Sequence, residues 1–245
     1  MTTDTSHPVL SLADRAYLSI RERILRGALR AGSPLSRRRV AAELGMSLLP
    51  VSEAFQRLES DGLLESRPRA GTRVRAPNEQ DIRERFEVRE ALESQAARLF
   101  AVRATGSDRE EIRRLAEQLD LLFNRLWAGE SDAEFPYTVY DFHSQFHMRV
   151  AECARCSALR QLVDKNLLIL HWGCAAPANR SALPPGFHRD LADVLTSGHP
   201  LAADRAMRDH VRYGLDEKIR KLEASPSLEW RERRNTRQAR DTMTP

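Results

Sequence analysis

The chain has 245 residues, which is long enough for two domains that each bury a core. Its formal net charge is only +4, and it has three cysteines, an odd and small number that argues against a disulfide scaffold. No apolar stretch approaches the roughly 18–20 residues of a membrane span, and the first residues do not form a signal peptide. We therefore expect a cytoplasmic protein that does not enter a membrane.

The positive charge is gathered at one end of the chain. Residues 1–77 carry 13 arginines and no lysine against eight acidic residues, a net charge of +5, and the remainder carries 26 basic against 27 acidic residues, a net charge of −1. This asymmetry favours a polyanionic partner for the first part of the chain, although a merely solvated charged surface would have the same composition.

Residues 1–77 show the element order of a winged helix-turn-helix. The predicted elements are a helix over Ser11–Leu29, a short helix capped by Ser36 and stopped by Gly45, a helix over Ser47–Asp61 with Ser47 as its cap, and two short strands over Leu63–Ser66 and Thr72–Arg75. The two strands would form a small β-hairpin wing beside the helices.

The rest of the chain is predicted to be all-α, so that the fold class is mainly α. A linker at Ala76–Glu79 leads into a helical bundle over residues 78–224, and residues 225–245 form a polar tail that we expect to be disordered. The predicted helices are Gln80–Ala104, Asp108–Ala128, Phe135–Ala154, Ala158–Trp172, Phe187–Thr196 and Leu201–Leu222, with a loop over Ala175–Gly186.

A winged helix-turn-helix such as residues 1–77 can bind double-stranded DNA, because one helix can enter the major groove while basic side chains of the wing reach phosphates or the minor groove. The alternative is a winged helix that docks another protein. The residues expected at DNA are Arg37, Arg38 and Arg39 before the groove-binding helix, Ser47, Leu48, Leu49 and Ser52 on it, and Arg67, Arg69, Gly71 and Arg73 in the wing.

The first 75 residues resemble the GntR family of bacterial transcription regulators. The similarity rests on Ile24–Gly27, Gly32–Ser36, Val40–Gly45, Pro50-Val51, Glu53-Ala54, Leu58-Glu59, Asp61–Leu63 and Gly71-Thr72. It implies DNA binding, and Arg38 matches a contact residue of the family.

One departure concerns the groove-binding helix. Family members usually have arginine, threonine and arginine where this chain has Leu48, Leu49 and Ser52. The resemblance therefore implies an operator that differs from the usual one, with a leucine packed on a thymine methyl group. Loss of DNA binding is the alternative.

Four histidines fall on apolar faces of predicted helices. His143 and His147 are four residues apart and hence neighbours on one helix face, while His188 and His210 lie on apolar stripes of two later helices. A single buried histidine is usually a hydrogen-bonded core residue. Four of them in one bundle also fit a metal site, since neutral imidazole is the commonest metal ligand.

The same region resembles the FCD ligand-binding domain of FadR-type GntR regulators. The matching stretches are Phe86–Arg89 with Leu92-Glu93, Phe146-His147 with Ala151-Glu152, and Met207–Val211. Metal-binding members use an aspartate and three histidines; His147, His188 and His210 match the histidines, and His143 stands in place of the aspartate. The resemblance thus implies an all-histidine site for a divalent metal, zinc or nickel.

Arg89 falls on the inward stripe of its predicted helix. A buried guanidinium needs an anion, which would be either an internal partner such as Glu93 or Glu152, or the carboxylate of an effector. The family resemblance favours the effector. We discount Cys153-Ala-Arg-Cys156 with the nearby His171 and Cys174 as a redox or zinc motif, because no second pair of this kind follows.

Together these features predict a homodimeric transcription regulator that binds an inverted-repeat operator in double-stranded DNA and responds to a small carboxylate effector bound next to the metal. One alternative is a constitutive DNA-binding regulator whose metal is purely structural. The other is a metal-dependent hydrolase, but no enzyme motif supports it, so we expect no catalytic activity.

Overall fold

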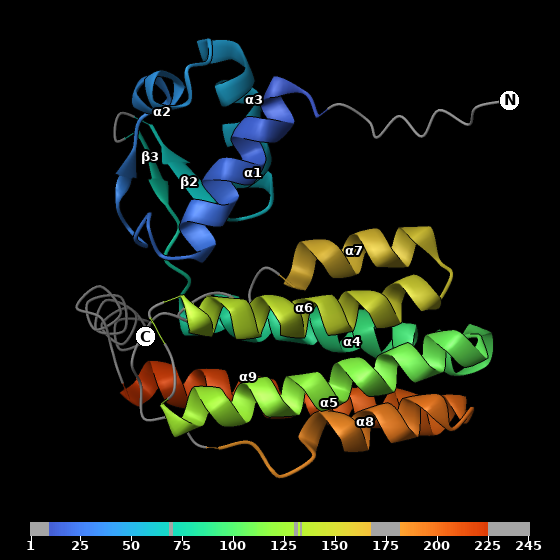
Figure 1. Cartoon of the computed structure of the whole chain (residues 1–245). Helices are drawn as coiled ribbons and strands as arrows, with labels where there is room; N and C mark the ends of the chain where they lie inside the picture. The colour runs from blue at the N-terminus through green and yellow to red at the C-terminus, as the bar shows by residue number, and fades with distance from the viewer. Residues whose placement is uncertain (1–9, 69–70, 130–131, 133, 168–181, 225–245) are drawn as a thin grey trace, which may run out of the picture. The chain divides into compact units, whose positions relative to one another are not determined.

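A computed structural model describes residues 10–68, 71–129, 132, 134–167 and 182–224. The chain divides into two compact units, Met1–Ala76 and Pro77–Pro245, which we call the winged unit and the helical unit. Each unit is described by itself, and Figure 1 gives the elements of both. No helix among the described residues is long and apolar enough to cross a membrane.

The winged unit has three helices, and their ends follow from local sequence. They are α1 (Leu12–Leu25), α2 (Arg37–Leu44) and α3 (Leu48–Ser60). Helix α1 stops four residues earlier than predicted, since Arg26 is its C-cap and Gly27 adopts a φ of 78°. The hydroxyl of Ser36 caps α2, and Gly45 ends it with a φ of 62°.

The start of α3 corrects one expectation. Ser47 is the N-cap residue, but its side chain makes no capping hydrogen bond. The helix is held instead by its apolar face, on which Val51, Phe55 and Leu58 are fully buried. Burial of each such side chain is worth about 1.5–3 kcal/mol, so packing rather than capping fixes this helix.

The wing is a three-stranded antiparallel sheet rather than a simple hairpin. Strands β2 (Leu64–Arg67) and β3 (Gly71–Val74) form the predicted hairpin, and β1 (Pro34–Leu35) pairs with the other edge of β3, giving the order β1-β3-β2. Strand β1 was not predicted, because two residues beginning with proline show no strand periodicity. Its pairing ties the segment before α2 to the wing.

The helical unit contains α4 (Glu79–Arg103), α5 (Gly106–Ala128), α6 (Phe135–Cys153), α7 (Ser157–Leu167), α8 (Phe187–Thr196) and α9 (Pro200–Ala224). Helix α4 packs against α9, α6 and α7, and α5 packs against α6 and α8 (Figure 1). Their apolar faces form one core that includes Phe86, Phe100, Leu119 and Phe146. The described residues of this unit form no strand, as predicted.

Candidate metal centre and nucleic-acid interface

The four histidines come from three helices of the helical unit. His143 and His147 lie one turn apart on α6, His188 is the second residue of α8, and His210 lies midway along α9. The side chains of His147, His188 and His210 are buried, and His143 is half-buried. The apolar face of each helix therefore carries its imidazole into the bundle.

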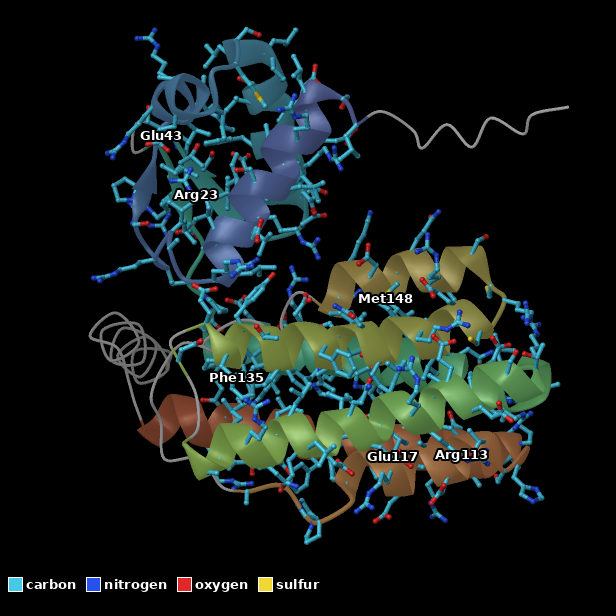
Figure 2. The ribbon with its side chains drawn as sticks, viewed as in Figure 1. Arg23, Glu43, Arg113, Glu117, Phe135 and Met148 are labelled. Atoms are coloured by element: carbon cyan, nitrogen blue, oxygen red, sulfur yellow. The ribbon has the colours of Figure 1, made fainter. Side chains whose placement is uncertain are left out.

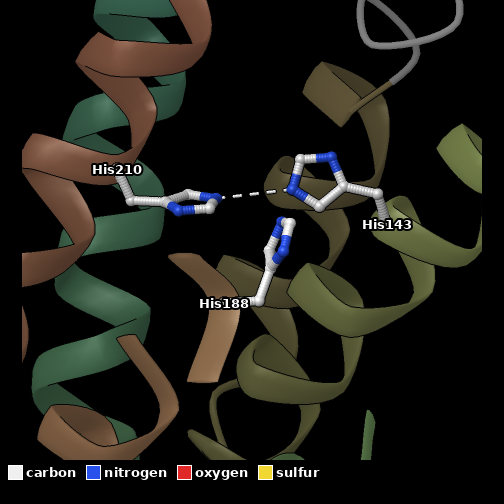
Figure 3. A group of neighbouring side chains, drawn as sticks. All are labelled: His143, His188 and His210. Atoms are coloured by element: carbon white, nitrogen blue, oxygen red, sulfur yellow. Dashed lines mark hydrogen bonds between the residues drawn. The ribbon is translucent and has the colours of Figure 1, made fainter. Parts of the chain in front are cut away.

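Their rings converge on one place. One ring nitrogen each from His143, His188 and His210 lies within 4.8 Å of the others, and Figure 3 shows these three rings turned toward one another. His147 adjoins the group through His143, with 2.9 Å between their Nε2 atoms, and the Nε2 atoms of His143 and His210 are 3.4 Å apart. All four sequence-predicted residues are thus neighbours.

The surroundings of His143, His188 and His210 favour the neutral imidazole. Burial lowers the pKa of His143 and of His210 well below the usual value, and the neighbouring histidines lower both pKa values further. Burial also lowers the pKa of His188, although Asp120 opposes that change. Neutral imidazole is the form that binds a metal, because its unprotonated nitrogen keeps a lone pair.

Two carboxylates that the sequence analysis did not connect with histidines hold the outer side of the cluster. Asp120 on α5 lies 2.8 Å from Nδ1 of His188, and Glu93 on α4 lies 2.5 Å from Nδ1 of His147. Such carboxylates orient metal-binding histidines and make them better donors. No local signal could have paired Asp120 with His188, since 68 residues separate them.

The donor set fits a divalent metal. Nε2 of His188 is buried without a hydrogen-bond partner among the described residues, and the Nε2 atoms of His143, His147 and His210 lie against one another. Leaving polar atoms buried and unpaired costs free energy, which a shared cation would recover. Imidazole nitrogens suit zinc, nickel and copper rather than magnesium or calcium.

Arg89 lies beside this cluster and is paired internally. Its guanidinium donates to Glu93 from Nε at 2.6 Å and from Nη2 at 3.3 Å, and both side chains are at most 3% exposed. It also lies over the ring of Phe86, 4.7 Å from the centroid. Of the two internal partners considered, Glu93 is the one used; Glu152 pairs with Arg149.

A cavity of about 70 Å³ adjoins the histidines. His143, His188 and His210 line one part of it, and Arg89 also lines it. Aromatic side chains form most of the remaining wall, with Phe123, Trp127, Tyr140, Phe187 and Tyr213 among them, and Lys218 lies at its lining too. The cavity thus combines an apolar wall with two cationic groups, the carboxylate of Glu217 and metal-type donors.

In the winged unit, the three arginines at the start of α2 differ in their surroundings. Arg38 and Arg39 are exposed, and Arg39 pairs with Glu43 one turn later. Arg37 is half-buried, because its guanidinium lies over the ring of Phe55 and donates to Glu59 at 3.1 Å. Arg38 is therefore the most available of the three for a phosphate.

Two leucines are exposed at the start of α3. Leu48 is 47% and Leu49 is 69% exposed, whereas Ser52 donates to the carbonyl oxygen of Leu48 at 2.8 Å. Exposed apolar side chains at the beginning of such a helix can contact thymine methyl groups in a major groove. Ser47 is also exposed beside them.

The wing presents its basic residues around the β2–β3 turn. Arg67 is exposed and pairs loosely with Glu65 at 3.4 Å, Gly71 is exposed with a φ of 75°, and Arg73 is half-buried in β3. Arg69 lies outside the described residues. A side chain at position 71 would be strained, so glycine suits this turn. Figure 2 labels Arg23 of α1 and Glu43 of α2, which form an ion pair at 3.0 Å between these two helices.

The first cysteine of the discounted motif, Cys153, is not activated. Cys153 is buried and burial raises its pKa to about 12, so its thiol stays protonated. Its partner in the motif, Cys156, is half-buried, and His171 and Cys174 lie outside the described residues.

A winged helix-turn-helix followed by an all-helical unit is the architecture of a class of proteins, the DNA-binding transcription regulators. Comparison with known families gives the particular group. Residues 12–74 match the model described as "Bacterial regulatory proteins, gntR family", and residues 84–213 match the FCD domain. The chain belongs to the GntR family and carries an FCD domain, a combination consistent with the FadR-type subfamily.

Relatives and solved structures agree. The chain is 33% identical over 77% of its length, and 80% of the relative's, to a protein described as a "Probable D-xylose utilization operon transcriptional repressor" of Paenarthrobacter nicotinovorans. It is 24% identical to the transcriptional repressor RspR of Escherichia coli K12, covering 91% and 95% of the two chains. A GntR regulator structure from Rhodococcus sp. RHA1 shares the fold with a TM-score of 0.64 and 22% identity, over 86% of this chain and 98% of that one. The protein is a transcription regulator and not an enzyme.

Proposed function

We propose that this regulator binds a divalent metal, zinc or nickel, in its helical unit and senses a small carboxylate beside that metal. His143, His147, His188 and His210 would hold the metal. When bound, the metal would supply a positive charge that attracts an anionic ligand. The observation that carries this proposal is the convergence of neutral histidine nitrogens beside a cavity.

The chemistry of the cavity supports an anionic effector. The proposed donors are imidazole nitrogens, which bring no negative charge to a bound dication, and Glu93 and Asp120 at the outer nitrogens would offset part of its charge. Arg89 adds a guanidinium to the cavity lining, and a guanidinium binds carboxylates with good geometry. A sugar acid, hydroxy acid or amino acid carries the required carboxylate.

The winged unit would bind operator DNA as one half of a homodimer. Two-fold proteins read two-fold sites, so the operator would be an inverted repeat. Arg37, Arg38, Arg39, Arg67, Arg69 and Arg73 would meet the backbone, Gly71 would allow close approach, and Ser47, Leu48, Leu49 and Ser52 would face the bases. An effector can change DNA affinity only by binding two arrangements of the dimer with different affinity.

A structural metal is the rival function, and the presence of four histidines favours it because four protein donors can complete a zinc site. An electrophoretic mobility shift on duplexes selected from a random pool separates the two. The protein would be loaded with zinc or stripped by a chelator, and tested with D-xylonate, L-lactate, an amino acid or D-xylose, the sugar in the name of one relative.

The sensor proposal predicts that at least one carboxylate changes the DNA affinity of the zinc-loaded protein by at least about fivefold, a typical coupling, and has no effect on the stripped protein. Arg89→Gln should abolish the response. Zinc-dependent DNA binding that no anion alters would favour the structural metal instead.

A further inference from the structure

Glu93 touches both the candidate metal centre and the arginine of the cavity. Its Oε1 accepts from Nε of Arg89, and its Oε2 lies 3.3 Å from Nη2 of Arg89 and 2.5 Å from Nδ1 of His147. One carboxylate oxygen is thus shared between the guanidinium and the imidazole. All three side chains are buried, so water does not separate them.

The two partners of this shared carboxylate differ in kind: Arg89 is a cation, and His147 is a candidate metal donor. The Glu93 side chain is only 3% exposed, and its nearest charged or polar partners are the guanidinium of Arg89 and the imidazole of His147. Arg89 makes no ion pair with another acid among the described residues, and it lines the cavity. Glu93 therefore supplies the counter-charge for Arg89 as well as the support for His147.

We infer that Glu93 is a positioning residue that couples the metal to the cavity, because Arg89 and metal-bound His147 compete for its carboxylate. This inference rests on the proposed metal and effector site. When Arg89 holds Glu93 strongly, less negative charge remains for the imidazole, and His147 is a weaker donor. When another anion takes up Arg89, Glu93 turns its hydrogen-bonding capacity to His147, and the metal binds more tightly.

The coupling gives a carboxylate effector a defined action. An effector carboxylate on Arg89 would release Glu93 toward His147 and so raise metal affinity, and by linkage the metal would raise effector affinity by the same factor. The metal and the effector would then bind as a cooperative pair. Direct attraction between the two charges would also give cooperativity, so the test must isolate the part that passes through Glu93.

A double-mutant cycle with the metal alone isolates that part. Zinc affinity of the full-length protein would be measured by competition with a chromogenic chelator for wild type, Arg89→Gln, Glu93→Gln and the double variant. Arg89→Gln leaves the Glu93 charge wholly to His147, so we expect roughly tenfold tighter zinc binding. Glu93→Gln removes that charge, and we expect zinc affinity to fall by about 10- to 100-fold, as for other carboxylates behind metal-binding histidines.

The decisive value is the effect of Arg89→Gln once residue 93 is glutamine. We expect it to fall below about twofold, because the path through Glu93 is gone. An effect of equal size in both backgrounds would overturn the inference, since Arg89 would then act on the metal by direct repulsion. If wild type itself binds no zinc, the proposed function fails as well, and the two failures are distinguishable.

Two further variants serve as controls for this experiment. Arg98→Gln, at an exposed position on the same helix, controls for general effects on α4 and should leave zinc affinity within about twofold. Arg89→Lys keeps the charge and loses the two-pronged contact, so it should tighten zinc binding less than Arg89→Gln. It replaces Arg89→Gln in the cycle if circular dichroism shows that the glutamine variant is unfolded.

Discussion

Asp120 holds His188 by both its backbone and its ring. The Oδ1 atom of Asp120 accepts from the backbone N–H of His188 at 3.0 Å and lies 2.8 Å from Nδ1 of the same residue. Because Nδ1 is engaged in this way, the tautomer with a free Nε2 is favoured, and Nε2 is the nitrogen left for the histidine cluster. Helix α5 therefore sets the donor that α8 contributes.

Replacing Asp120 with alanine should weaken zinc binding by about 10- to 100-fold, because the ring of His188 loses its orientation and part of its basicity. Zinc competition with a chelator measures the change. Glu117→Ala removes an exposed carboxylate three residues earlier on α5 (Figure 2) and should have no effect. Equal zinc affinity in the two variants would contradict a role for Asp120.

Arg38→Ala should weaken binding to all duplexes alike, since the exposed guanidinium is expected to meet a phosphate. Loss of one phosphate contact lowers the slope of log affinity against log salt by about one. Fluorescence anisotropy of a labelled duplex between low and moderate salt gives this slope. Arg114→Ala, an exposed arginine of the helical unit, is the control and should keep the wild-type slope.

Leu49 tests the predicted contact with a thymine methyl group. Leu49→Ala should cost about 1–2 kcal/mol of binding to a selected operator, the value of a small apolar contact. Deoxyuridine in place of the contacted thymine removes the methyl group that Leu49 is proposed to contact. It should therefore weaken binding by wild type but not by Leu49→Ala. Leu18→Ala, which trims a leucine 40% exposed on α1, should respond to deoxyuridine as wild type does. If deoxyuridine weakens DNA binding by wild type and by Leu49→Ala alike at every position, this contact is contradicted.

We expect the helical unit to become less stable in acid, because ionised Asp108 stabilises it. Hydrogen bonds from the backbone and the side chain of Thr105, together with the nearby charge of Arg149, lower the pKa of Asp108 to about 2. Since the ordinary pKa is about 4, the ionised carboxylate stabilises the fold fully above pH 4, and this contribution is lost as the pH falls to about 2. Asp108→Asn should therefore lose about 1 kcal/mol at neutral pH, as for other helix-capping changes.

The difference between wild type and Asp108→Asn should shrink steadily between about pH 4 and pH 2. Urea unfolding followed by tryptophan fluorescence measures it, because Trp127, Trp172 and Trp230 all belong to the helical unit. Asp164→Asn changes an exposed carboxylate on α7 and serves as the control. A constant difference across this range would show that ionised Asp108 does not contribute.

Most helices could be predicted because their apolar residues recur with helical spacing and their ends carry caps. Helix α8 has the bounds expected for it, Phe187–Thr196. Two predictions for the winged unit were wrong. The short strand β1 depends on pairing with Arg73 and Thr72, which are far along the chain. Helix α1 ends early, at Leu25, because the positive φ of Gly27 outweighs the apolar pattern beyond it.

The site was predictable only in part. Periodicity places all four histidines on inward helix faces, and the family resemblance implies that they are metal ligands, but neither identifies the supporting acids. Asp120 stands on a helix without histidines, and Glu93 has both Arg89 and His147 as partners. The sequence analysis weighed an internal ion pair and an effector as alternatives for Arg89. A residue that pairs with Glu93 and also lines the cavity can serve both.

The metal content of the purified protein tests the central claim most directly. After dialysis against metal-free buffer following zinc loading, elemental analysis should give about one zinc per wild-type chain, a tightly held structural or sensory ion. His147→Ala and His188→Ala should retain far less, whereas His199→Ala, which alters an exposed histidine before α9, should retain as much as wild type. Equal zinc in all four proteins, or none in wild type, would contradict the account.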